Sequence, residues 1–161
     1  MGRREVVNEH LRTFAAKAGV EDGLALGDDG TCGVALGAGE NAVEAGLEVI
    51  EEEGLILFHA KLGDLEPGAG ADALQRLLAL NAYGVETGGG VVGLDEETRE
   101  VVLTFAWPFD TLDYAQFEGL IERLFSATSY LRERLAEATA AAADEGGREA
   151  RSRPPSGAIW G

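Results

Sequence analysis

The sequence predicts an α+β domain in which helices pack on a twisted antiparallel sheet. Three segments have the apolar spacing of amphipathic helices, and five shorter segments have the alternating or continuous apolar pattern of strands. Short turns join most of the strands, which favours antiparallel pairing between neighbours. The expected order of elements along the chain is therefore α-β-β-β-α-β-β-α.

The first expected element is a helix. Its small and apolar side chains recur at helical spacing, namely Val7, Leu11, Phe14, Ala15 and Ala18. Gly19 follows directly, and glycine is common just beyond the last turn of a helix because it adopts positive φ without strain. The sequence therefore predicts that this helix ends at about residue 18.

Three strands are expected next, at residues 31–36, 42–50 and 55–62. In the second strand, apolar residues alternate with glutamates and a glycine, which is typical of a sheet with one face in water. The third strand is apolar on both faces, so Ile50, Leu55 and Leu57 should form an apolar surface opposite the core. This surface either binds a partner or is covered by a helix or a second subunit.

The second half of the chain should contain a helix at about residues 71–83, a short strand at 91–94 and a long strand at 100–107. Pro108 is expected to end the long strand, because proline cannot donate a hydrogen bond to the ladder.

The last expected helix has the strongest apolar periodicity in the chain. Asp113 and Gln116 predict a capping box at its start, with Leu112 packing against Phe117. The alanine-rich segment after Leu135 leads into glycines and an Arg/Pro/Ser sequence, so we expect the helix to fray there. The predicted organisation is a domain over residues 1–138 and a disordered tail over residues 139–161.

Charge disfavours two classes of partner, nucleic acid and anionic membranes. The formal net charge is −16, from 29 acidic and 13 basic residues, so phosphate backbones and anionic membranes would be repelled. The single cysteine, Cys32, excludes an internal disulfide and suits a reducing compartment. The first residues lack the apolar stretch of a signal peptide, so we expect a cytoplasmic protein.

Catalytic and metal-binding patterns are weak. His10, His59 and Cys32 fall on different expected elements without metal-ligand spacing, and His59 is expected at the end of its strand. The sequence therefore predicts no metal site, no cofactor and no enzyme activity. A hydrolase that uses carboxylates is the enzymatic alternative, given the many acids.

Glycines 88, 90 and 93 match the G-x-G-x-x-G dinucleotide pattern, but a helix precedes them and a strand follows. That pattern binds a cofactor only where a strand leads into a helix whose N-terminus meets the pyrophosphate. We therefore expect a tight turn from a helix into a strand, with glycine where φ is positive or where backbones approach closely.

Residues 77–90 read LLALNAYGVETGGG, and residues 91–103 read VVGLDEETREVVL. These stretches resemble the class I chaperones of bacterial type III secretion, the Tir-chaperone (CesT) family. In that family a leucine-rich helix ends in Asn shortly before Thr-Gly-Gly, and an Asp-x-Glu-Thr-Gly turn then joins two strands. Arg99 stands where the turn usually has glycine. With the segment GLALGDDG at residues 23–30, the resemblance covers about residues 5–137.

The resemblance implies a homodimer that binds the N-terminal, non-globular segment of a secreted effector without any nucleotide. A regulatory protein of the same fold, which sequesters another chaperone or an activator, is the alternative. On this basis the residues expected to contact the effector are Val7, Leu11, Phe14, Leu47, Leu55 and Leu57. The residues expected at the dimer interface are Leu77, Asn81, Val91, Phe105 and Trp107.

Overall fold

The computed structural model describes residues 2–20, 23–37, 39, 42–65 and 71–152. Its helices are α1 (Arg3–Ala18), α2 (Ala71–Leu80) and α3 (Tyr114–Ser152), with short 3-10 turns η2 (Ala82–Gly84) and η3 (Phe109–Thr111). Its strands are β1 (Thr31–Leu36), β2 (Val43–Ile50), β3 (Leu55–Asp64), β4 (Val91–Leu94) and β5 (Glu100–Pro108). The predicted α+β class and order of elements are confirmed.

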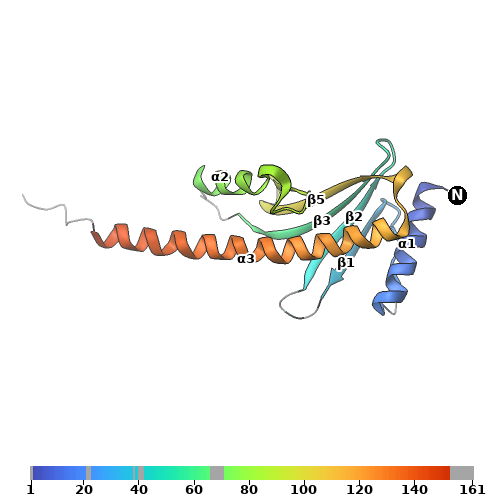
Figure 1. Ribbon diagram of the computed structural model, residues 1–161, viewed down its shortest axis with the longest axis horizontal. Helices are drawn as coiled ribbons and strands as arrows, with labels where there is room; N and C mark the ends of the chain where they lie inside the picture. Colours follow the sequence, from blue (N-terminus) through green and yellow to red (C-terminus); the bar gives the residue numbers. More distant parts are fainter. Residues whose placement is uncertain (1, 21–22, 38, 40–41, 66–70, 153–161) are drawn as a thin grey trace, which may run out of the picture.

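The described strands form one sheet in the order β1-β2-β3-β5-β4, and every neighbouring pair is antiparallel. Strand β1 is therefore one edge of the sheet and the short strand β4 is the other. Helix α3 lies across the sheet and packs on β3, β5 and β2, while α1 lies near the N-terminal end of α3 (Figure 1).

Burial follows the predicted alternation. In β2 the buried side chains are Val43, Ala45, Leu47 and Val49, and in β3 they are Ile56, Phe58, Ala60 and Leu62. Helices α1 and α3 contribute their apolar faces to the same core. The two helices therefore cover one face of the sheet, which is the arrangement that buries an amphipathic stripe against a sheet.

Both predicted helix ends are confirmed. Gly19 has φ 71°, and its N–H donates to the Ala15 carbonyl oxygen. At the start of α3, the Gln116 N–H donates to Asp113 Oδ1 at 2.7 Å. The Asp113 N–H donates in return to Gln116 Oε1 at 3.0 Å, which completes the capping box.

Removal of this cap should destabilise the fold by a modest amount. Asp113→Ala is expected to lower the free energy of unfolding by about 1 kcal/mol, because the Gln116 N–H in the first turn loses its acceptor. Asp113→Asn should cost less, since asparagine is also a strong cap. Urea unfolding measures both variants. Equal losses in the two would show that the carboxylate charge, and not the capping bond, is what matters.

Two glycines in the turn between η2 and β4 adopt positive φ, Gly88 at 63° and Gly89 at 91°. A Cβ on Gly90 would lie 2.9 Å from Leu103 Cδ1, so the backbone passes close to β5. The predicted tight turn is confirmed. Arg99, at the position of the related turn's glycine, also has positive φ, at 60°.

Three segment boundaries differ from the prediction. Helix α2 ends at Leu80, because Tyr83 adopts a φ of 62° that a continuous helix does not allow. Strand β3 continues to Asp64, so His59 lies within it and not at its end. Helix α3 continues to Ser152 instead of fraying after Leu135, consistent with the strong helix propensity of its Ala, Glu and Arg residues. The remainder of the expected tail, 153–161, lies outside the described residues.

Candidate functional site

The six side chains expected to contact an effector fall into three groups. Val7, Leu11 and Leu47 are at most 3% exposed and belong to the core. They therefore hold α1 on the sheet and do not stand free on the surface, while Leu11 and Leu47 also line the floor of a depression beside α1. Phe14 is half-buried at the margin of the core. Leu55 and Leu57 are half-buried on the opposite face of the sheet, so the six do not line one groove.

A narrow, largely enclosed apolar depression of about 10 Å³ lies between α1, α3 and the inner face of β1, β2 and β3, near the β1 edge of the sheet. The half-buried side chains at its margin are Phe14, Leu24 and Val34, and its floor includes the buried Leu47 and Phe58. Leu24 comes from the segment between α1 and β1 and was not predicted as a site residue, because residues 23–30 served only as part of the family resemblance. The alternation of Leu24 and Leu26 with small residues was the available signal.

The edge of the sheet beside this depression is available for pairing. Strand β1 pairs with β2 along Thr31 to Leu36 and has no strand on its other side in the described sheet. An edge strand presents backbone N–H and C=O groups to which an extended peptide can add. Depression and edge together offer apolar contacts and backbone hydrogen bonds to one extended segment.

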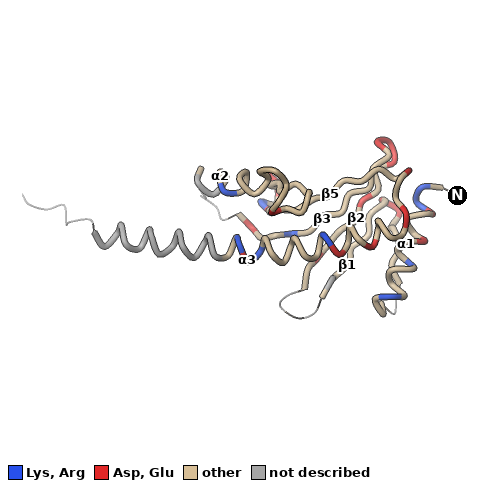
Figure 2. The backbone as a smooth tube through the Cα atoms, in the orientation of Figure 1, with Lys and Arg blue, Asp and Glu red and all other residues tan. Residues whose placement is uncertain are grey.

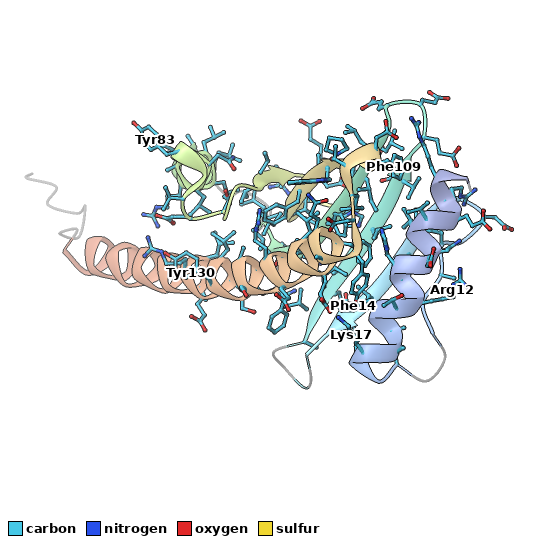
Figure 3. The ribbon with its side chains drawn as sticks, turned by 45° about the vertical axis from the view of Figure 1, so that its right-hand side comes forward. Arg12, Phe14, Lys17, Tyr83, Phe109 and Tyr130 are labelled. Atoms are coloured by element: carbon cyan, nitrogen blue, oxygen red, sulfur yellow. The ribbon has the colours of Figure 1, made fainter. Side chains whose placement is uncertain are left out.

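Helix α1 is held beside the depression by contacts with the start of α3. Lys17 Nζ lies 2.9 Å from Glu118 Oε1 and 4.6 Å from the centre of the Tyr114 ring. The Tyr114 hydroxyl donates to the same carboxylate at 3.0 Å. The hydrogen bond from Lys17 lowers the pKa of Glu118 below its usual value. In Figure 3, Phe14 and Lys17 lie on the side of α1 that faces α3, and Arg12 points away.

The five residues expected at a dimer interface are also divided. Leu77 and Phe105 are buried in the core of the single chain, which corrects their expected place on an interface surface. Asn81 lies between α2 and β4, where its amide exchanges two hydrogen bonds with the backbone of Val92, at 2.9 and 2.7 Å. Trp107 is half-buried against the core. Val91 is on the surface, 63% exposed.

Around Val91, exposed apolar side chains gather on neighbouring elements. We call them the α2–β4 surface: Leu74, Leu78, Tyr83, Val85 and Val91. Tyr83 is 99% exposed and Val85 is 80% exposed. Leu74, Leu77 and Leu78 have the spacing of one helical stripe, yet only Leu77 is buried among these three. An apolar surface of this kind marks an interaction site.

The titratable side chains form no reactive centre in the described part of the chain. No group of three His, Cys, Asp or Glu residues there could hold a metal ion. Burial raises the pKa of the Cys32 thiol, which disfavours the reactive thiolate. His10 packs against the rings of Tyr114 and Phe117, and the His59 ring lies over Gly46. Among the described helices, none is long and apolar enough to cross a membrane.

The family model for the Tir chaperone protein (CesT) family matches residues 9–132, which is most of the chain. The chain belongs to this family. Membership confirms the resemblance to the class I type III secretion chaperones. It also confirms the prediction that the protein is a non-enzymatic chaperone.

Solved structures support the fold of this Tir-chaperone family member. The ExsC–ExsE complex contains a chain with a TM-score of 0.70 and 22% identity, covering 84% of this chain and 97% of that one. For the HopA1–SchA chaperone–effector complex, the TM-score is 0.63 and the sequence identity is 20%, with 80% of this chain and 94% of that chain covered. For the ExoU–SpcU complex of the Pseudomonas aeruginosa type III secretion system, the TM-score is 0.54 and the sequence identity is 22%, with 76% of this chain and 95% of that chain covered. A search of curated proteins finds no significant match.

Proposed function

We propose that the protein is a cytoplasmic, homodimeric chaperone that binds the N-terminal, non-globular segment of a type III secretion effector and keeps it competent for secretion. Its membership in the Tir chaperone family supports this proposal. The HopA1–SchA structure, which shares the fold, is itself a chaperone–effector complex. A chaperone of this kind needs apolar surface and a free strand edge, and it needs no catalytic groups.

The observation that carries the proposal is the group of half-buried apolar side chains beside the free β1 edge. Phe14, Leu24 and Val34 leave part of their apolar surface uncovered next to a strand that lacks a second neighbour. An extended segment added to β1 would send alternate side chains towards the depression, because successive strand residues point to opposite faces. Only an unfolded segment can bind in this way, which matches the non-globular part of a client.

The α2–β4 surface is the proposed contact between the two subunits. Its side chains are apolar and exposed, and they lie on the far edge of the sheet from β1. Pairing two copies would cover Tyr83 and Val85, while the depression and the β1 edge of each copy stay open. The arrangement therefore leaves two equivalent client sites per dimer.

The test is capture of the client by the tagged full-length chain from the bacterium that encodes it. The captured proteins are identified by mass spectrometry, and the protected segment is mapped by limited proteolysis. Phe14→Asp and Leu24→Asp should each weaken binding of the purified client by about tenfold or more, because a charge is placed against an apolar contact. Thr13→Asp, an equal change on the exposed side of α1, should leave binding unchanged.

The outcome distinguishes the two classes of partner. A protected N-terminal segment in a secreted protein would support the effector chaperone. Capture of another chaperone or of a transcriptional activator, with no secreted protein, would contradict the proposal and favour the regulatory alternative.

A further inference from the structure

The face of the sheet turned away from α1 and α3 carries its own apolar patch at the end near the β2–β3 turn. In the strand register, Ile50 is opposite Leu55, Leu55 is opposite Pro108, and Leu57 is opposite Ala106. These residues are the outer patch: Ile50, Leu55, Leu57, Ala106 and Pro108. None of the five belongs to the core or packs against it among the described residues. The outer patch is thus a second apolar surface, separate from the depression beside α1.

Acidic side chains lie beside this patch on β2 and in the β2–β3 turn. Glu48 is opposite Leu57 in the register, and Glu52 and Glu53 lie in the exposed turn between β2 and β3. None of these three carboxylates has an ion pair with another described residue. The arginines at this end are already paired, Arg3 with Asp110 and Arg4 with Glu51. Figure 2 shows the concentration of acids at the turn.

We propose that the outer patch docks a basic amphipathic helix of a partner protein. The half-buried Ile50, Leu55 and Leu57, beside the exposed Ala106 and Pro108, favour a partner with an apolar face. Unpaired carboxylates beside them favour lysine and arginine on the flanks of that face. The backbone groups of β2 and β3 are bonded within the sheet, so a partner contributes side chains only. A helix lying flat on the sheet does this, as α3 does on the inner face.

This docking surface goes beyond the proposed client site. The outer patch and the depression are on opposite faces of the sheet, so both can be occupied at once. The two sites also differ in chemistry, since the depression offers apolar side chains and a strand edge. A partner on the outer patch therefore need not compete with a client bound at β1.

A designed helical peptide of leucine and lysine, with all leucines on one face, serves as the probe. Binding to the full-length protein is measured by fluorescence anisotropy at physiological salt. Leu57→Ser should weaken binding by about tenfold, as should the double variant Glu52→Lys with Glu53→Lys. The matched charge control is Glu96→Lys with Glu97→Lys in the exposed β4–β5 turn, roughly 25 Å along β5 from the patch. The matched apolar control is Val20→Ser, just beyond the end of α1.

The controls decide between local docking and general attraction. The outer patch is supported if both patch variants bind the peptide more weakly while both controls keep an affinity within about twofold of the wild type. The distant charge control should have little effect, because a charge beyond a Debye length is screened. Equal loss in the two charge variants would overturn the proposal, since the peptide would then respond only to net charge. Loss with Phe14→Asp and not with Leu57→Ser would also overturn it, by placing the peptide in the depression. If Leu57→Ser does not fold, the two charge variants still decide the result.

Discussion

Leu78→Glu combined with Val85→Glu is expected to convert a dimer of about twice the 16.9 kDa chain mass into a folded monomer. Both side chains are largely exposed in the single chain, at 71% and 80%, so the changes should not disturb its core. In a dimer joined through the α2–β4 surface, they would place four unpaired carboxylates in an apolar contact. Each such group costs several kcal/mol, so dissociation should be complete at micromolar concentration. Sedimentation equilibrium measures the mass.

The control for this experiment carries the same charge on a different surface. Thr13→Glu combined with Ala115→Glu changes exposed positions on α1 and α3, and the dimer should persist. A dimer that also persists in the Leu78/Val85 variant would place the subunit contact elsewhere. A wild-type protein that is monomeric over the whole concentration range would contradict the homodimer itself.

The sheet could be predicted well from the sequence because strand side chains alternate strictly between two faces. Val43, Ala45, Leu47 and Val49 were assigned to one face from spacing alone, and all four are buried. The helix ends were predicted equally well. Glycine at position 19 allows a positive φ, and the Asp113 side chain accepts a capping hydrogen bond. These signals depend on neighbouring residues in the sequence, so they can be interpreted without knowing what packs on the element.

The candidate site was predicted less well, because an apolar stripe does not say what will cover it. Leu11 and Phe14 share a stripe on α1, yet Leu11 is buried while Phe14 reaches the margin of the depression. The stripe on α2 has the opposite outcome, since Leu74 and Leu78 remain exposed in the single chain. Tyr83 was missed as a surface anchor because its exposure depends on a positive φ that ends the helix. Such features depend on tertiary contacts and on the partner.

Phe117 connects α1 to the sheet and to α3 through ring contacts. It is fully buried, and its ring centre lies 5.4 Å from that of His10 and 5.6 Å from that of Phe58. It therefore joins α1, β3 and α3 in one aromatic cluster, to which Phe14 contributes at 6.5 Å. Deletion of the ring would leave a cavity that these three elements can close only by moving closer together, which would disturb their other contacts.

Phe117→Ala is expected to lower the free energy of unfolding by about 3–5 kcal/mol, the usual cost of truncating a buried phenylalanine. Urea unfolding at one fixed protein concentration measures the change, so that dimerisation contributes equally to each variant. Phe125→Ala is the matched control, because it removes the same ring from a half-buried position farther along α3. Hydrogen exchange should show that α1 loses more protection than β5 in the Phe117 variant. Equal costs for the two phenylalanines, with uniform loss of protection, would mean that α1 is held mainly by its own contacts with the sheet through Val7 and Leu11.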